Sequence, residues 1–129
     1  MRYLLDTNIL SKRDSYAKAR TRILQHYLQV AISSISIAEI SAGIEYLHAG
    51  RKRAELEAFL RELLQEHVIF PFGTAEALAW GKYIASAGRP LPRYDSLIAA
   101  TAIANNLEVV TENTADFPGV QSVNPLKVK

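Results

Sequence analysis

Short apolar segments alternate along this chain with longer stretches in which hydrophobic residues recur at helical spacing. Five of the short segments are predicted to be buried strands, because they are brief, apolar and bounded by polar or turn-forming residues. They are Tyr3–Leu5, Val30–Ser33, Val68–Phe70, Glu108–Val110 and 120–123. Strands separated by helices favour a parallel sheet with right-handed crossovers, so the pattern predicts a three-layer α/β/α sandwich.

Helices are predicted wherever apolar residues return every three or four positions. The clearest pattern covers 51–66, where one face carries Leu56, Phe59, Leu60, Leu63 and Leu64. Further helices are predicted over 15–28, 36–48, 74–87 and 95–105. Gly50 and Gly88 are expected to end two of these helices, and Pro90 and Pro92 require an extended loop before the last one.

The predicted architecture indicates where a ligand would bind. In open α/β sheets, ligands bind beyond the carboxyl ends of the strands, where the strand order reverses. Asp6 directly follows the first strand, and Glu39 lies in the first turn of the helix after the second. Asp95 opens a helix, and Asp116 follows the fourth strand. We therefore expect these four acids, which come from different segments, to meet at one end of the sheet.

Three of these acids also have an ordinary structural alternative. Asp95 suits a helix N-cap, and Glu39 follows Ser36 at the spacing of a capping box. Asp116 suits an Asx-turn with its own backbone. Asp6 is harder to explain in this way, because an acid placed after a buried strand and before further apolar residues is poorly solvated and needs a partner.

Four carboxylates at one place would repel one another and raise their own pKa values unless a cation compensates them. The nearest basic residues in the sequence are Lys12 and Arg93, and neither is directly beside the acids. Oxygen ligands without His or Cys favour Mg²⁺ or Mn²⁺ over zinc, and such sites serve phosphate chemistry. Four short polar residues lie near these acids in the sequence: Thr7, Asn8, Thr111 and Asn113. We expect them either to hydrogen-bond to the acids or to substrate phosphates, or to form ordinary turns.

Composition narrows the class of protein further. The chain has 129 residues, enough for one domain over 1–129, and its formal net charge of +2 permits contact with a polyanion. It contains no cysteine, which excludes disulfides, Cys-ligated zinc and thiol nucleophiles. No apolar run reaches the roughly 20 residues of a membrane span, and Asp6 interrupts any signal-peptide core, so a cytoplasmic location is expected.

Four ordered blocks of this sequence resemble the PIN-domain nucleases, and especially the VapC-type toxins of bacterial toxin–antitoxin pairs. The first is Leu-Leu-Asp-Thr-Asn-Ile-Leu over 4–10, and the second is Ser-Ser-Ile-Ser-Ile-Ala-Glu-Ile over 33–40 with Gly43. The third is Tyr-Asp-Ser-Leu-Ile-Ala-Ala-Thr-Ala over 94–102, and the fourth is Val-Thr-Glu-Asn over 110–113 with Asp116 and Phe117. Together they span nearly the whole chain in the expected order.

The resemblance implies a Mg²⁺- or Mn²⁺-dependent ribonuclease with strand order 3-2-1-4-5. It also implies that the catalytic and metal-binding acids are Asp6, Glu39, Asp95 and Asp116. VapC-like toxins usually form homodimers, are inhibited by a cognate antitoxin protein and cleave tRNA or ribosomal RNA. Glu112 departs from the basic or neutral residue expected beside Thr111, and it adds a negative charge that could join the metal site.

The basic residues gain a possible role from this resemblance. Phosphate contacts provide affinity for RNA, and the best-placed candidates are Lys12, Arg13, Arg89 and Arg93. The helices over 15–28 and 51–66 could form the dimer interface or the antitoxin groove, with packing against the sheet as the alternative. His26, His48 and His67 fall in or beside helices, and we expect them to be structural or surface residues.

Other classes with an acid after the first strand fit less well. A phosphatase of the haloacid dehalogenase kind needs a second aspartate where this chain has Asn8. A receiver domain needs a phosphate-accepting aspartate after the third strand, where Pro71 and Phe72 stand. Within the PIN family, the remaining alternatives are an RNA-processing nuclease that is not a toxin, and a binding or scaffold module without catalysis.

Overall fold

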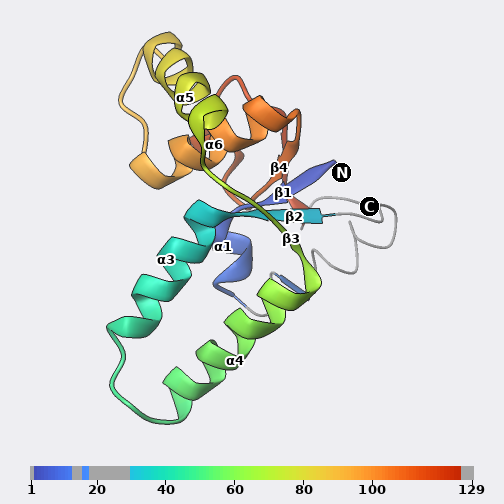
Figure 1. The fold of residues 1–129 in the computed structure, drawn as a ribbon. Helices are drawn as coiled ribbons and strands as arrows, with labels where there is room; N and C mark the ends of the chain where they lie inside the picture. The colour runs from blue at the N-terminus through green and yellow to red at the C-terminus, as the bar shows by residue number, and fades with distance from the viewer. Residues whose placement is uncertain (1, 13–15, 18–29, 126–129) are drawn as a thin grey trace.

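The computed structural model describes residues 2–12, 16–17 and 30–125 (Figure 1). Most of the helix predicted over 15–28 therefore lies outside the described residues, as do Arg13 and His26.

The predicted strands form one sheet in which every neighbouring pair is parallel. They are β1 (Tyr3–Leu5), β2 (Val30–Ser33), β3 (Val68–Phe70), β4 (Glu108–Val110) and β5 (Ser122–Val123). Their order, β3-β2-β1-β4-β5, confirms the order 3-2-1-4-5. Only β5 is shorter than predicted, because Gly119 adopts φ 74° and the N–H of Val120 donates to the carbonyl of Phe117 in a turn.

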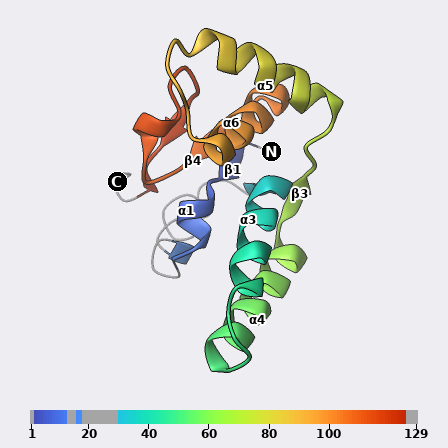
Figure 2. The ribbon, with the colours of Figure 1, turned by 90° about the vertical axis from the view of Figure 1, so that its left-hand side faces the viewer.

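Helices cover both faces of the sheet (Figures 1 and 2). The structure has α1 (Thr7–Leu10), α3 (Ser34–Glu45), α4 (Arg51–Glu66), α5 (Thr74–Ser86) and α6 (Arg93–Asn105). Helix α4 has the predicted bounds, and α3, α5 and α6 differ from them by one to three residues at their ends. Helix α1 was not predicted, because its four residues are too few to show a helical period.

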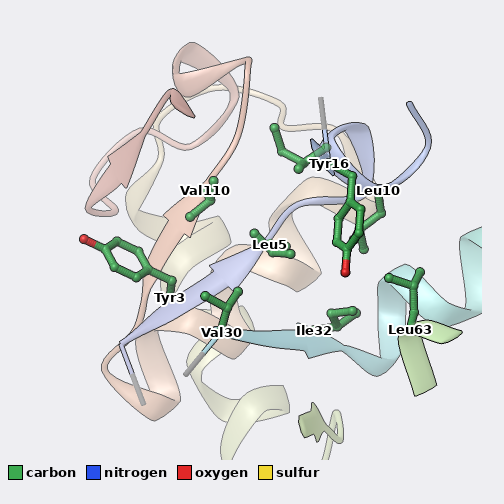
Figure 3. Packing of buried hydrophobic residues seen from close by; sticks show 9 residues of the cluster. Tyr3, Leu5, Leu10, Tyr16, Val30, Ile32, Leu63 and Val110 are labelled. Atoms are coloured by element: carbon green, nitrogen blue, oxygen red, sulfur yellow. The ribbon is translucent and has the colours of Figure 1, made fainter. Parts of the chain in front are cut away.

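Successive side chains of each strand point to opposite faces of the sheet, so the core has two layers. On one face, Tyr3 and Leu5 of β1 pack with Leu10 of α1 and Leu63 of α4 (Figure 3). On the other face, residues of β1, β2 and β4 pack against α5 and α6, a cluster formed by Leu4, Ala31, Tyr83, Ile98, Ala99, Ala102, Leu107, Val109 and Phe117. This arrangement confirms the predicted three-layer sandwich.

One of the two predicted glycine stops is wrong. Helix α3 ends at Glu45 with Tyr46 as its C-cap, whereas Gly50 is the N-cap of α4 and has φ 155°. Gly88 does follow α5 with φ 69°, as a helix stop requires. At the end of α6, Asn106 takes the left-handed conformation, with φ 55°, that glycine more often supplies.

The two described histidines are structural or surface residues, as predicted. His48 is exposed. The Nδ1 atom of His67 lies 3.1 Å from the carbonyl oxygen of Val30, and its Nε2 lies 2.8 Å from the hydroxyl of Tyr16. Because a carbonyl only accepts, Nδ1 carries the proton, and in the neutral ring Nε2 accepts from Tyr16. In the described ranges, no helix is long and apolar enough to cross a membrane.

Candidate active site

The strand order places a switch point between β1 and β4. From β1 the chain moves through β2 to β3 on one side, and it returns on the other side through β4 to β5. Asp6 directly follows β1, and Thr111 directly follows β4. The two strands are paired in parallel with Leu5 opposite Val110, so Asp6 and Thr111 are neighbours at the same edge of the sheet. These two residues therefore lie where ligands bind in folds of this kind.

Asp6 is held from both sides. Its side chain is 2% exposed, and its Oδ1 accepts a hydrogen bond of 2.8 Å from the N–H of Thr7. Its Oδ2 accepts a 2.8 Å bond from the hydroxyl of Thr111. That hydroxyl oxygen accepts in turn from Asn8 Nδ2 at 3.2 Å and from the N–H of Asn113 at 3.0 Å. The four predicted supporting residues thus surround Asp6, with Asn113 acting through its backbone.

Glu39 reaches this site from α3. The hydroxyl of Thr7 donates to its Oε1 at 2.7 Å. The capping-box alternative for Glu39 is wrong, because Ser33 is the N-cap of α3 and its side chain accepts from the N–H of Ile35. Glu39 therefore lies in the second turn of α3, not in the first as predicted, and its side chain is available for another role.

The structural alternatives for Asp95 and Asp116 are not observed. Pro92 is the N-cap of α6, so Asp95 is the third residue of that helix and makes no cap hydrogen bond. Asp116 ends the 3₁₀ segment η2 (Thr114–Asp116), and its side chain makes no hydrogen bond to another described residue. Both side chains are partly buried.

Two residues that support the first turn of α6 were not predicted. The Ser96 hydroxyl donates to the carbonyl of Arg93 at 2.6 Å and accepts from Trp80 Nε1 at 2.9 Å. This pair ties α5 to the turn that carries Asp95. Both residues lie within predicted helices, but nothing in the sequence shows that these helices meet at this point.

The four acids form one electrostatic cluster. Burial raises the pKa of Asp6 from 3.8 to about 6; the negative charges of Asp95 and Glu39 also raise it, and the Thr111 and Thr7 hydrogen bonds lower it. Burial likewise raises the pKa of Asp95 to about 6, with further contributions from the charges of Asp116 and Glu39. Each of the four acids that the sequence singled out is therefore electrostatically coupled to at least one other.

No basic side chain neutralises this cluster in the part of the chain that the structure describes. Lys12 Nζ lies 3.6 Å from Glu112 Oε2, so the unexpected Glu112 faces a positive charge. Arg89 donates to the carbonyl of Ala115 at 3.0 Å, beside Asp116, and Arg93 is exposed on the first turn of α6. A role of Lys12, Arg89 and Arg93 in RNA binding stays a prediction.

Comparison with known proteins agrees with the strand order. The model of the PIN domain family matches residues 3–121. This chain belongs to the PIN domain family. Ribonuclease VapC1 of Rickettsia felis is 30% identical over 131 residues, which cover 99% of this chain and 97% of that protein.

Further relatives match over similar lengths. The tRNA(fMet)-specific endonuclease VapC of Salmonella typhimurium is 30% identical over 130 residues, covering 94% of this chain and 96% of that protein. A chain of a toxin–antitoxin complex from Klebsiella pneumoniae is 30% identical, with a TM-score of 0.72 and coverage of 95% of this chain and 97% of that chain.

The donor set of this PIN domain fits a hard divalent cation. Every candidate ligand is a carboxylate, and oxygen donors select Mg²⁺ or Mn²⁺ over softer metals. In the described ranges, no group of three or more His, Cys, Asp or Glu side chains is arranged to hold a metal ion as it stands. The fit of a cation therefore rests on donor chemistry and on the uncompensated charge of Asp6 and Asp95.

A groove of about 340 Å³ lies between α1, α3 and α4 of this PIN domain and includes Glu39. Thr7 and Glu39 line it together with Ser11, Gly43 and Lys52. The remaining lining residues are apolar and comprise Leu10, Ile40, Ile44, Leu47, Leu56 and Phe59. The groove is therefore mostly apolar and includes one of the four acids.

Proposed function

We propose that this chain is a Mg²⁺- or Mn²⁺-dependent endoribonuclease, and that it is the toxin of a toxin–antitoxin pair that stops translation by cleaving tRNA or ribosomal RNA. The observation that carries this proposal is the cluster of four acids at the switch point of a PIN-family sheet. The proposal is supported by relatives named ribonuclease VapC1 and tRNA(fMet)-specific endonuclease VapC, each matching more than nine-tenths of this chain.

In this proposal the four acids hold the cation, and each acid comes from a different segment of the chain. Asp6 is the fixed centre, because both of its oxygens already accept a hydrogen bond. Glu39 and Asp95 complete the site from α3 and α6, with Asp116 as a further ligand or as the carboxylate that orients water. When bound, the cation supplies Lewis acidity and offsets the charge of the scissile phosphodiester.

Exposed basic residues beside the acids would attract RNA. Lys12 follows α1, the helix that begins after Asp6, and Arg93 precedes Asp95 in the first turn of α6. Arg89 donates to the Ala115 carbonyl beside Asp116. Contacts from such residues to phosphates would position the strand without reading its sequence. Neutral replacements of Lys12 or Arg93 should therefore weaken binding of all RNAs alike.

The substrate class is tested by giving the purified chain matched RNA and DNA strands, and pools of tRNA and ribosomal RNA, in Mn²⁺. The proposal expects discrete RNA fragments from one of the pools and no cleavage of DNA. Mapping the fragment ends would identify the target. Cleavage of DNA alone, or no cleavage of any pool by folded protein, would contradict the proposal.

We infer that the partner is a cognate antitoxin that occupies the groove between α1, α3 and α4. The toxin–antitoxin complex from Klebsiella pneumoniae supports a partner of this kind. The groove is mostly apolar and includes Glu39, so a segment bound there would bury apolar side chains and cover one of the acids.

Leu47→Asp is expected to weaken antitoxin binding about tenfold or more, because it places a charge among the apolar residues that line the groove. Leu78→Asp is the matched control, since Leu78 is 67% exposed on α5, on the opposite face of the sheet. Each variant would be co-expressed with the protein encoded by the neighbouring reading frame, and complex formation measured by titration. Equal affinity of the two variants for the antitoxin would show that the antitoxin does not bind in this groove.

A nuclease of this kind would act in the cytoplasm, and we expect a homodimer, which sedimentation can test. The alternatives are an RNA-processing nuclease that is not a toxin and a PIN module without catalysis. Expression in cells separates them: a toxin arrests growth and its neighbouring gene product relieves the arrest, a processing nuclease does neither, and a silent module cleaves nothing in vitro.

A further inference from the structure

Two hydroxyl groups connect helix α3 to the candidate active site. The Oγ atom of Ser36 lies 2.8 Å from Thr7 Oγ1, which lies 2.7 Å from Glu39 Oε1. Ser36 is fully buried and precedes Glu39 by one turn of α3, whereas Thr7 is the first residue of α1. The three side chains thus form a continuous chain of hydrogen bonds between α1 and α3.

The direction of this chain follows from the number of protons available. A Thr hydroxyl has one proton to donate, and an ionised carboxylate can only accept. Thr7 therefore donates to Glu39, and the proton between Ser36 and Thr7 must come from Ser36. Because each bond polarises the next, donation from Ser36 strengthens the bond that Thr7 makes to the carboxylate.

Thr7 also couples Glu39 to Asp6. Its backbone N–H donates to Asp6 Oδ1 at 2.8 Å, while its hydroxyl donates to Glu39 Oε1. One residue thus fixes one oxygen of each of two acids that lie 33 positions apart in the sequence. A glutamate side chain has several rotatable bonds, and fixing them costs conformational entropy. Because Thr7 already holds Glu39, less of this entropy remains to be lost when the carboxylate binds a ligand.

The second carboxylate oxygen of Glu39 is left open. Oε2 makes no hydrogen bond to another described residue, and Glu39 lines the groove beside α1. The contact with Thr7 thus holds one oxygen in place and leaves the other without a hydrogen bond to the described residues.

We propose that Ser36 and Thr7 form a positioning relay that fixes Glu39 Oε1 and so orders the Glu39 carboxylate that would help to hold the divalent cation. The inference rests on the proposed function, since it assigns these residues a role toward the same site. It adds Ser36, a buried residue with no exposed surface, to the groups on which that site depends.

The test compares three variants for Mn²⁺ affinity, measured by titration, and for RNA cleavage. Thr7→Val keeps the shape of the side chain but removes the hydroxyl, and it is expected to weaken Mn²⁺ binding and to slow cleavage by about 10- to 100-fold. Thr7→Ser restores the hydroxyl and should bring both values back to within a few-fold of wild type. Ser36→Ala leaves Thr7 without its donor and should cost about fivefold in Mn²⁺ affinity, the value of one hydrogen bond.

Thr101→Val is the matched control. Thr101 is also fully buried, but its hydroxyl donates to the carbonyl of Leu97 within α6, away from the acids. This variant should bind Mn²⁺ and cleave RNA like wild type. Wild-type Mn²⁺ affinity in both Thr7→Val and Ser36→Ala would overturn the relay and reduce it to packing between α1 and α3. If the wild-type chain bound Mn²⁺ but cleaved no RNA, the proposed function would fail, while the Mn²⁺ titrations would still decide the relay.

Discussion

Asp95→Asn is expected to reduce RNA cleavage by on the order of 100-fold or more while the protein remains folded. Asparagine has nearly the same shape as aspartate, but it lacks the charge that a divalent cation requires of its ligand. Asp95 makes no cap hydrogen bond, so the substitution removes no structural contact at the start of α6. Initial cleavage rates in Mn²⁺ measure the effect, and circular dichroism checks the fold.

Glu108→Gln is the control for the loss of one acid. Glu108 is partly buried at the start of β4, at the opposite end of the strand from Thr111 and Asp6. This variant should cleave at the wild-type rate, because its carboxylate lies far from the cluster. Normal turnover by Asp95→Asn would remove Asp95 from the site and would contradict the assignment of the four acids.

Asp6→Asn is expected to stabilise the metal-free protein near neutral pH while abolishing cleavage. The pKa of Asp6 rises from 3.8 to about 6 on folding, chiefly because the group is buried. A shift of about two pKa units corresponds to about 3 kcal/mol of destabilisation once the group is ionised. Asparagine avoids this cost but disturbs the hydrogen bond from Thr111, so a net gain of about 2 kcal/mol is expected.

The same shift predicts how stability depends on pH. Between pH values of about 4 and 6, unfolded Asp6 has lost its proton while folded Asp6 retains it. The contribution of Asp6 to stability therefore falls as pH rises through this window, and it stays low above pH 6. Asp95, whose pKa is also raised to about 6, acts in the same direction.

Urea unfolding in EDTA across this range would measure the effect as the difference between wild type and Asp6→Asn, since titrating groups that do not interact with Asp6 then cancel. The difference should grow from pH 4 to pH 6 and shrink when Mn²⁺ is added at neutral pH, because the cation stabilises only the protein that binds it. A difference that is constant with pH would show that Asp6 bears no unfavourable charge. A difference that Mn²⁺ does not change would show that Asp6 does not help to bind the cation.

The sequence predicted the sheet well because its strands are short apolar runs between clear helical patterns. The helix boundaries depended on contacts that no local pattern reveals. Ser33 caps α3, so the helix begins at Ser34, and Glu39 falls one turn deeper than a capping box would place it. Gly50 was predicted to end a helix, but it begins one instead.

The placement of the four acids at one end of the sheet was predicted from the rule that ligands bind at the carboxyl ends of the strands. The residues that hydrogen-bond to the acids could not be predicted in this way. Thr111 bonds to Asp6 across 105 positions, and only the parallel register of β1 and β4 brings the two together. Ser36 was read as part of a cap because the sequence does not show that α1 lies beside it. The ion pair of Lys12 with Glu112 likewise joins the turn after α1 to the loop after β4.

The central claim is that the four acids form a metal-dependent ribonuclease site. The most direct measurement is cleavage of purified tRNA and ribosomal RNA by the chain, first in EDTA and then after Mn²⁺ or Mg²⁺ is added in excess to the same sample. We expect no cleavage in EDTA and discrete RNA fragments as soon as the cation is restored. Cleavage that continues unchanged in EDTA would contradict it.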